Sequence, residues 1–430
     1  MKHFFRTVVV RVLTIEAAIL LRRTRPIVIA ITGSVGKTST KDAIYAALKQ
    51  HFRARKSEKS FNSDIGVPLT VLGLPNGWNN PLIWLRNIVD GFFAAFFARS
   101  YPEVLILETG IDRPGDMQRL TQWLQPNIVV LTRLPDVPVH VEYFASPEAV
   151  VHEKLKLVSA LRPDGILVYN HDDPIIERER HAFHQRQIGF ARYLETDVTA
   201  RGDETVYQDD RPVGVSCTYR VQEQAYEVTI ADTIGTQHIY SVGAALAVAT
   251  ALELPIPQVV QSLKSLRTPN GRMRLIPGIK GTLLIDDTYN SSPIAVEYAL
   301  QALGELRYLK RKIVVLGDML ELGKYANEAH KQVGALVPGV ADQLVTVGVR
   351  ARGIAAGALA AGMDEAAILQ YDDSRRAGRE LQQFIQPGDV ILVKASQSIR
   401  AERIIEELMA EPERADELLV RTDPVWRRIA

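Results

Sequence analysis

The sequence predicts an α/β protein made of a central domain with a mostly parallel sheet and a second, Rossmann-like α/β domain. Short apolar runs rich in β-branched residues alternate with helical patterns along most of the chain, which is typical of parallel sheets covered by helices. The alternation restarts after a segment with proline and glycine at residues 268–272. The 430 residues leave room for two such domains. We therefore expect an N-terminal apolar helix at residues 1–25, a central domain at 26–268 and a C-terminal domain at 269–430.

The composition excludes several classes of partner and site. Lysine and arginine together number 51 against 50 for aspartate and glutamate, so the overall charge gives no indication of a nucleic-acid partner. Cys217 is the only cysteine, which excludes an internal disulfide and a cluster of thiolate metal ligands. A single cysteine also fits a reducing compartment. We therefore expect a cytoplasmic protein with no nucleic-acid partner.

Two apolar segments, residues 4–21 and 81–98, stand apart from the strand and helix alternation. Arg11 and Glu16 interrupt the first segment and no small-residue cleavage site follows it, so no secretory signal is expected. Neither segment is long or apolar enough to span a bilayer. We expect helices that pack on each other; the alternative is peripheral membrane contact through both segments. Large apolar residues of the second segment share one helical face: Leu85, Ile88, Val89, Phe92 and Phe96.

The first strand, the first interior helix and the turn between them form the most informative stretch. Residues 26–31 are a β-branched run, residues 32–38 are a tight turn with two glycines, and an alanine-rich helical pattern begins at residue 39. Glycines let the backbone approach a phosphate, helix-start amides point at it, a lysine adds positive charge, and a threonine hydroxyl can reach a magnesium ion. The usual P-loop spacing would place a glycine at Ile31, so this is a shortened variant. The pattern predicts, in place of an ordinary turn, a nucleoside-triphosphate cradle formed by Gly33, Ser34, Val35, Gly36, Lys37, Thr38 and Ser39.

Further strands follow the cradle, and several end in polar residues. The predicted strands of the central domain lie at residues 103–107, 127–131 and 164–169. An antiparallel extension is expected at residues 197–240. The predicted strands of the second domain lie at residues 282–285, 312–316, 343–347 and 389–393. Open α/β sheets bind ligands at the carboxyl ends of their strands, so we expect this edge of the second domain to face the first.

A triphosphate cradle needs magnesium, and magnesium prefers hard oxygen ligands. Thr38 in the cradle and Glu108, directly after a buried strand, are the natural pair. His140 and Lys154 follow in the same predicted domain. A lone histidine is more often a structural hydrogen-bonding residue and a helix lysine is more often exposed, so their order alone is suggestive only.

Six segments, in order, resemble the motif series of the Mur ligase family. They lie at residues 32–38, 62–68, 108–110 with 114–116, 140–144, 286–293 and 316–323. The last two are most similar to the MurF branch of that family. The resemblance extends from about residue 26 to residue 407 and, taken together, the motifs are highly specific.

The resemblance implies an enzyme that phosphorylates a carboxylate with ATP and lets an amine attack the acyl phosphate. It implies that Lys37 and Thr38 hold phosphates and a first Mg²⁺, which Glu108 also reaches. It places His140 and Lys154 at a second Mg²⁺, where Lys154 matches the family's carbamylated lysine. Without that modification Lys154 would be a cation beside cations, and repulsion would oppose the site.

The resemblance also implies roles for the second domain. Arg272 would approach the phosphates across a hinge, so that closure of the two domains completes the site and excludes water. Asp287 would contact the nucleotide ribose. The substrate side is expected to include Asn62, Asn290, Asp318 and Lys394.

The sequence departs from the family pattern at three places. Full-length members have an N-terminal domain that binds the uridine nucleotide, whereas about 25 residues precede the cradle here, so we expect the acceptor to be held without such a domain. Ile239 and Val242 stand where the family commonly has asparagines, and Arg133 stands where an asparagine is usual. We therefore expect altered contacts to the nucleotide.

The expected function is that of an ATP-dependent, ADP-forming amide ligase. The resemblance implies that it adds D-alanyl-D-alanine, or another amino acid or dipeptide, to a cell-wall peptide precursor. The acceptor is expected to be either a precursor held by other surfaces or a lipid-linked one approached through the two apolar segments. Its substrates are therefore small molecules or peptides.

Two other classes of protein would share part of this pattern. A ligase like folylpolyglutamate synthase would keep the cradle and the metal residues, but the run at residues 318–323 favours the MurF branch. A nucleotide-binding switch or a pseudoenzyme partner would keep the cradle. Such a switch has no need of the predicted metal residues together with Arg272, so the ligase is the better interpretation.

Overall fold

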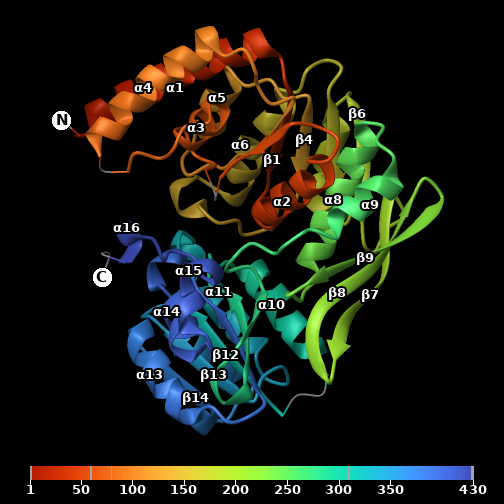
Figure 1. The fold of residues 1–430 in the computed structure, drawn as a ribbon. Helices are drawn as coiled ribbons and strands as arrows, with labels where there is room; N and C mark the ends of the chain where they lie inside the picture. Colours follow the sequence, from red (N-terminus) through yellow and green to blue (C-terminus); the bar gives the residue numbers. More distant parts are fainter. Residues whose placement is uncertain (1, 59–60, 79, 308–309, 428–430) are drawn as a thin grey trace.

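The computed structural model describes residues 2–58, 61–78, 80–307 and 310–427 (Figure 1). Residues 1 and 428–430, which the predicted domain limits include, lie outside the described residues. The chain forms a nine-stranded sheet from its first part and a six-stranded sheet from its second part. Figure 1 shows the two parts one above the other, with helices covering both sheets. The predicted fold class is confirmed.

The nine-stranded sheet is parallel except at one edge. Its strands are β1 (Ile27–Thr32), β2 (Ala54–Lys56), β3 (Val104–Glu108), β4 (Ile128–Leu131), β5 (Ile166–Asn170), β6 (Arg186–Ala191), β7 (Val198–Gln208), β8 (Arg211–Val221) and β9 (Gln224–Ala231). They are arranged in the order β2-β3-β1-β4-β5-β6-β7-β8-β9. Pairing is parallel up to β7 and antiparallel from β7 to β9. The expected antiparallel extension is confirmed for these three strands, whereas residues 237–240 begin a helix.

Helices cover both faces of this sheet. They are α1 (Lys2–Thr24), α2 (Lys37–Leu48), α3 (Gly66–Leu72), α4 (Pro81–Phe97), α5 (Asp116–Thr121), α6 (Pro147–Ser159), α7 (Pro174–Glu179), α8 (Gln237–Ala251) and α9 (Ile256–Leu263). Alternate residues of β1 point to opposite faces: Ile29 and Ile31 pack with α2, α8 and α9, while Val28 and Ala30 pack with α1, α3, α5 and α6. Burial on both faces explains why the central strands are almost entirely apolar.

The six-stranded sheet belongs to the second part of the chain. Its strands are β10 (Arg274–Pro277), β11 (Leu283–Asp287), β12 (Arg311–Gly317), β13 (Gln343–Val347), β14 (Ile368–Tyr371) and β15 (Asp389–Lys394). They are arranged in the order β10-β11-β15-β12-β13-β14, and only β10 is antiparallel to its neighbour. The helices are α10 (Pro293–Glu305), α11 (Ala326–Ala335), α12 (Arg352–Ala360), α13 (Ser374–Phe384), α14 (Glu402–Leu408), α15 (Ala415–Leu418) and α16 (Pro424–Arg427).

Short 3-10 helices complete the described elements. They are η1 (Val141–Tyr143), η2 (Arg180–Ala182), η3 (Ile279–Gly281), η4 (Gly323–Tyr325), η5 (Glu365–Ala367), η6 (Gln397–Ile399) and η7 (Pro412–Arg414). The domain limits at residues 25/26 and 268/269 stay predictions. An isolated bridge joins Thr233 to Arg274, so the start of the second sheet is tied to the end of the first.

The expected packing of the two apolar segments on each other is confirmed, because α1 lies along α4 (Figure 1). The face of α4 that packs on α1 is not the large apolar face that the sequence pattern shows. α4 buries its small or polar residues Asn87, Gly91 and Ala95, whereas most of the large apolar face faces outward. Arg23 near the end of α1 donates to the carbonyl oxygens of three residues at the end of α4. Among the described residues, no helix has the length and hydropathy that crossing a bilayer requires.

Glu16 is a buried carboxyl in α1 that faces α4. Its side chain is 6% exposed, and its Oε2 has no hydrogen-bond partner among the described residues. A Cβ added at Gly91 would lie 2.2 Å from that oxygen, so the glycine makes room for it. Burial raises the pKa of Glu16 to about 7 from an ordinary value of 4.5. Because ionisation of the buried carboxyl destabilises the folded state, this group lowers the free energy of unfolding as the pH rises. Its full stabilising contribution is present below pH 4.5 and is lost as the pH rises through 7.

Replacing the carboxyl by an amide should therefore stabilise the protein at alkaline pH. We expect Glu16→Gln to raise the free energy of unfolding at pH 8 by on the order of 2 kcal/mol, with a gain that shrinks as the pH falls towards 5. Denaturant titrations across this range measure the effect. Asp90→Asn, which removes the exposed acid of α4, is the control and should change stability little. Equal stability of Glu16→Gln and the parent at pH 8 would contradict the assignment.

Candidate active site

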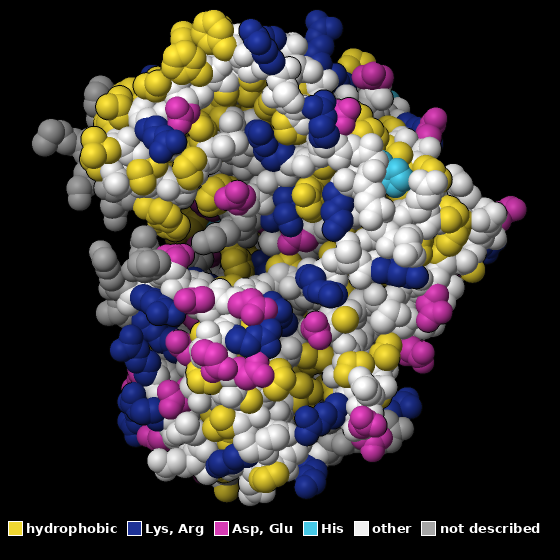
Figure 2. Space-filling model, in the orientation of Figure 1, with side chains coloured by type: hydrophobic (Ala, Val, Ile, Leu, Met, Phe, Trp, Pro, Cys, Tyr) yellow, Lys and Arg dark blue, Asp and Glu magenta, His cyan; other side chains and the backbone are white. Residues whose placement is uncertain are grey.

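A cavity of about 710 Å³ lies between the two sheets, and the surface is hollowed there (Figure 2). It brings together many of the residues that the sequence predicts. From the first part of the chain these are Ser34, Val35, Lys37, Asn62, Glu108, His140 and Lys154. From the second part they are Arg272 and Asn290. The cavity therefore has walls from both halves of the chain.

The cradle loop joins β1 to α2 in a conformation that glycine permits. Gly33 has φ 146°, and a Cβ there would lie 2.0 Å from the Thr132 hydroxyl oxygen. Gly36 has φ 85° and precedes the first residue of α2. The amide of Ser34 donates to the carbonyl of Arg133 at 2.7 Å, while the Ser34 hydroxyl oxygen is buried with no partner among the described residues. The loop is thus fixed by its backbone and leaves a polar side chain available to a ligand.

Two lysines converge on one carbonyl oxygen of this loop. The Nζ of Lys37 donates to the carbonyl of Gly33 at 2.8 Å, and the Nζ of Lys154 donates to the same oxygen at 3.2 Å. Burial lowers the pKa of Lys37, although the nearby Glu108 opposes this shift. Burial lowers the pKa of Lys154 further, and Lys37 adds to that effect. The amine of the partly buried Lys37 and that of the buried Lys154 meet at one point and make a site that an anion would stabilise.

Glu108 stands at the end of β3, beside the end of β1. Its Oε2 accepts a hydrogen bond from the Thr38 hydroxyl at 3.0 Å, and its Oε1 accepts one from the Asn62 amide at 3.2 Å. Thr38 and Ser39 are themselves nearly buried at the start of α2. A hydroxyl and a carboxylate next to a phosphate cradle are the hard oxygen donors that Mg²⁺ prefers. These residues therefore fit the predicted metal.

The other ligands of Mg²⁺ would come from groups other than Thr38 and Glu108. The described residues contain no group of three or more histidine, cysteine, aspartate or glutamate side chains arranged to hold a metal. Mg²⁺ commonly takes one or two protein oxygens and completes its octahedron with phosphate oxygens and water. The Thr38 and Glu108 pair matches that mode of binding.

His140 lies in the cavity and contacts carboxylates from both halves of the chain. Its Nδ1 is 2.9 Å from Glu321 Oε2, and its Nε2 is 3.9 Å from Asp112 Oδ1. Contact with His140 lowers the pKa of Glu321. The amide of Glu142 also donates to the carbonyl of Glu321 at 3.3 Å. In this structure the predicted metal ligand therefore links the two halves of the chain.

Arg272 enters the cavity from the segment before β10. Its guanidinium lies 4.3 Å from the centre of the Tyr289 ring, and its Nε is buried with no partner among the described residues. The backbone carbonyl of Arg272 accepts a hydrogen bond from Nε2 of His238, 3.2 Å away. Burial lowers the pKa of His238 to about 4, so the ring is neutral near pH 7. Since a carbonyl oxygen can only accept, the neutral ring of His238 carries its proton on Nε2. Through this hydrogen bond His238 acts as a positioning residue for Arg272.

Three residues predicted to contact ligands pair within the second domain, and none of the three lines the cavity. The Nζ of Lys394 donates to Asp287 at 2.6 Å and to the carbonyl of Asn290 at 3.0 Å. Asp318 accepts a hydrogen bond from the amide of Ala351 at 2.8 Å. In this conformation they brace the loops that follow β11, β12 and β15, and their expected contacts with ligands stay predictions.

The cavity also contains residues that sequence reasoning missed. These are Asp112, Tyr289, Glu321, Arg400 and Trp426. Tyr289 and Glu321 lie inside the recognised motifs, and Asp112 lies between the two parts of one of them, so their positions gave a signal that could have been used. Arg400 and Trp426 lie outside every motif; the Nη1 of Arg400 donates to the carbonyl of Trp426 at 2.9 Å. Only the fold brings the end of the chain to the cavity.

The departures from the family pattern have structural explanations. Ile239 and Val242 lie on α8 and are buried in the hydrophobic core. Arg133 lies with its Nε 3.5 Å from Asp173 Oδ2, and Asp173 also accepts from the amide of Leu134 at 2.7 Å. The two apolar side chains therefore stabilise the helix packing, and Arg133 is held beside the end of β5.

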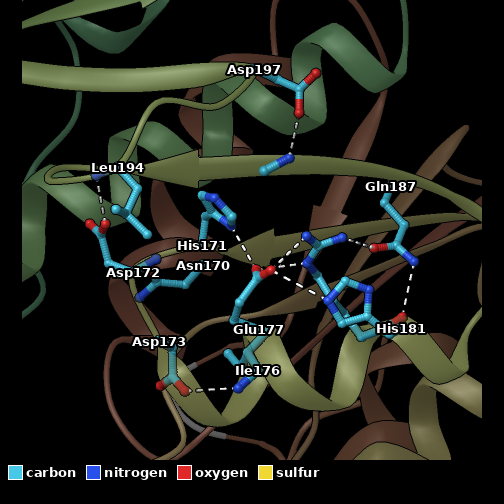
Figure 3. Close-up of polar contacts among 12 residues, drawn as sticks. Asn170, His171, Asp172, Asp173, Ile176, Glu177, His181, Gln187, Leu194 and Asp197 are labelled. Atoms are coloured by element: carbon cyan, nitrogen blue, oxygen red, sulfur yellow. Dashed lines mark hydrogen bonds and ion pairs between the residues drawn. The ribbon is translucent and has the colours of Figure 1, made fainter.

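A polar cluster at the end of β5 is satisfied by its own contacts (Figure 3). Glu177 lies 2.7 Å from Nδ1 of His171 and accepts from Arg180 at 2.6 Å. Asp172 accepts from the backbone amides of residues 192–194. Asp173 caps α7 by accepting from the amides of residues 175 and 176. These groups hold the loop beside the cradle.

Comparison with known proteins identifies the two halves of the chain. Residues 31–83 and 90–249 match the Mur ligase middle domain, and residues 271–397 match the glutamate ligase domain of the Mur ligases. The UDP-N-acetylmuramoyl-tripeptide–D-alanyl-D-alanine ligase of Bacillus subtilis is 28% identical, over 90% of this chain and 76% of that enzyme. The enzyme of the same name from Synechocystis is also 28% identical, over 89% of this chain and 75% of its own length.

Solved structures share the fold. The MurF ligase of Thermotoga maritima in complex with ADP aligns with a TM-score of 0.75 and 24% identity, covering 94% of this chain and 84% of that one. The folylpolyglutamate synthase of Mycobacterium tuberculosis, solved with ADP and AMPPCP, aligns with a TM-score of 0.62 and 16% identity, covering 91% and 94%. At these identities the likeness establishes the architecture.

The two family matches together cover well over half of the residues, and they fall on the same two halves as the two sheets. The relatives at 28% identity carry the name of one ligase. The resemblance seen in the sequence is thereby confirmed, and with it the class of an ATP-dependent, ADP-forming ligase. The chain belongs to the Mur ligase family.

Proposed function

We propose that this ligase joins D-alanyl-D-alanine to the free carboxylate of a cell-wall peptide precursor. The observation that carries the proposal is the single cavity that holds Lys37 and Glu108 from one half of the chain and Arg272 from the other. The names of the relatives at 28% identity support the choice of amine and acceptor. Both substrates are small molecules or peptides. The cytoplasmic location stays a prediction.

The cradle side of the cavity is suited to the phosphates. Lys37 is anchored on the Gly33 carbonyl, and Arg272 approaches from the opposite wall with its buried Nε unpartnered. Both cations would oppose the negative charge that grows on the transferred phosphate. Thr38 and Glu108 would hold Mg²⁺, which supplies further charge neutralisation at the phosphate oxygens when it is bound.

The reaction would proceed in two balanced steps. An oxygen of the acceptor carboxylate attacks the terminal phosphorus of ATP, the bond to the bridging oxygen breaks, and ADP leaves. The amine nitrogen then attacks the acyl carbon, phosphate leaves with its oxygen, and the nitrogen loses a proton. The residues of the chain contribute by positioning both substrates between the two walls and by excluding water from the acyl phosphate.

We further propose that Lys154 is carbamylated. Its side chain is 2% exposed, and it shares the Gly33 carbonyl with Lys37, so a second positive charge there is unfavourable. The neutral amine can attack carbon dioxide: a nitrogen–carbon bond forms, a C=O electron pair moves to oxygen, and a proton leaves the nitrogen. The product carries a negative charge beside Lys37. The resemblance to the family's modified lysine supports this step.

ADP formation should depend on both substrates and on the cradle lysine. With ATP, Mg²⁺ and UDP-N-acetylmuramoyl-tripeptide, we expect phosphate release only when D-alanyl-D-alanine is added. Lys37→Ala should lower the rate at least about 1000-fold, because the cation opposing the phosphate charge is lost. Lys49→Ala, an exposed lysine at the end of α2, is the matched control and should behave like the parent.

The outcomes separate the candidate functions. Turnover with L-glutamate in place of the dipeptide would favour a ligase like folylpolyglutamate synthase. Phosphate release that ignores every amine would favour a nucleotide switch. Full activity of Lys37→Ala, with unchanged thermal unfolding, would contradict its role.

The second domain should contribute to the chemical step through Arg272. We expect Arg272→Ala to lower kcat about 100-fold, since a cation placed for the developing charge is removed. Steady-state kinetics with varied ATP measure this. Arg267→Ala, an exposed neighbour in the same connection, is the control. An unchanged kcat for Arg272→Ala would show that Arg272 does not act on the phosphates in the closed enzyme.

The carbamate on Lys154 should be visible without turnover. In ¹³C-bicarbonate we expect one protein carbamate signal by ¹³C NMR, which disappears in Lys154→Arg and persists in Lys156→Arg, the next lysine on α6. Lowering the pH should release it, because protonation of the amine reverses the reaction. A parent spectrum without the signal near pH 8 would refute the modification.

A further inference from the structure

The outer side of α1 and α4 is the largest concentration of exposed apolar side chains in the structure. Sixteen large apolar side chains are exposed among the described residues, and eleven of them lie on α1, on α4 or in the turn before α4. We call the exposed side chains of residues 5–15, 78 and 80–97 the α1–α4 face. Figure 2 shows apolar side chains gathered over these two helices, with lysine or arginine between them. Contiguous apolar patches of this kind mark interaction surfaces.

Four phenylalanines form the centre of the α1–α4 face. Phe92, Phe93, Phe96 and Phe97 are all exposed, and Phe97 has 63% of its surface accessible. Their rings contact one another, with the centres of Phe92 and Phe96 4.9 Å apart. The helix buries its small residues Gly91 and Ala95 instead. The large side chains are therefore directed away from the core by the way the helix packs.

Arginines border the α1–α4 face. Residues 5–25 and 80–99 contain seven arginines and only two acids. Of these acids, Glu16 is buried, and Asp90 pairs with Arg86 at 3.1 Å. The border is therefore cationic. Exposed arginines that pair with no carboxylate of the described residues include Arg11, Arg22 and Arg99.

We propose that the α1–α4 face docks on the surface of an anionic lipid bilayer. A bilayer offers both partners that the face needs: an acyl region for the phenylalanines and leucines, and phosphate headgroups for the arginines. A second copy of this chain fits less well, because a symmetric contact would bring two cationic borders together. The charge of the border thus selects an anionic surface.

The α1–α4 face extends to the loop beside the cavity. Arg6 in α1 pairs with Asp64 at 3.0 Å, and the same loop carries Asn62, which lines the cavity. Figure 1 shows the start of α1 and the short helix α16 on the same side of the molecule. Docking would place this side next to the bilayer. The further consequence, that a membrane-bound acceptor is presented to the cavity, rests on the proposed function, whereas docking itself does not.

Vesicle flotation with the full chain tests the proposal. We expect the protein to float with vesicles of phosphatidylcholine and phosphatidylglycerol, to float less as salt is raised, and to stay unbound with phosphatidylcholine alone. Phe93→Glu with Phe97→Glu should weaken partitioning more than tenfold. Arg11→Glu with Arg22→Glu should weaken it by about fivefold or more per arginine.

Matched controls come from the second domain. Val349→Glu with Leu359→Glu alters two exposed apolar side chains there, and Arg352→Glu reverses an exposed arginine; neither should change partitioning. Circular dichroism and amine-dependent phosphate release with soluble substrates show that each variant is folded.

Several results would overturn the proposal. One such result is that the variant with Phe93→Glu and Phe97→Glu partitions to vesicles as strongly as the parent. A parent that ignores anionic vesicles but forms a dimer lost in this variant would assign the α1–α4 face to a second copy. Parent protein that catalyses ligation but never floats would refute docking and leave the proposed function standing.

Discussion

The rest of the site depends on positive charge enclosed at the Gly33 carbonyl. Lys37 and Lys154 come from different helices and meet at one oxygen, with the walls of the cavity limiting their contact with water. Such an arrangement is unfavourable in the absence of anions and becomes favourable when phosphate, or a negatively charged modification, enters. Gly33 is essential to it, because any side chain there would collide with Thr132. The backbone thus sets the electrostatics of the cavity.

The second half of the chain contributes by holding Arg272 and Glu321 in fixed positions at the cavity. Arg272 is held through its backbone by His238 on α8 and through its side chain by the ring of Tyr289. Glu321 reaches His140 in the first half. The contacts of His238 with Arg272 and of His140 with Glu321 form across the junction between the sheets, so the relative position of the two domains determines which charges face the phosphates. A movement of one domain would change the site without altering either sheet.

Periodicity and strand-end chemistry predicted much of this structure. The buried strands β1, β3, β4, β12 and β15 are apolar on both faces, and their sequences show it. The short edge strands β2 and β14 escaped notice because partly exposed strands have weaker patterns. Polar residues at strand ends were found, but sequence cannot tell whether two of them pair with each other, as Asp287 and Lys394 do. For α4, the apolar stripe indicated a helix, whereas the buried side carries Asn87, Gly91 and Ala95, with Gly91 making room for Glu16.

The pairing of α1 with α4 also affects how the chain is made. α1 ends at residue 24 and its partner helix ends at residue 97, so about 70 more residues must leave the ribosome before the two can meet. At about 5–20 residues per second this takes several seconds, a long interval compared with helix formation. During that time the nascent helix exposes Val9, Leu13 and Leu20, which the finished fold hides. Synthesis therefore leaves this apolar surface uncovered for several seconds.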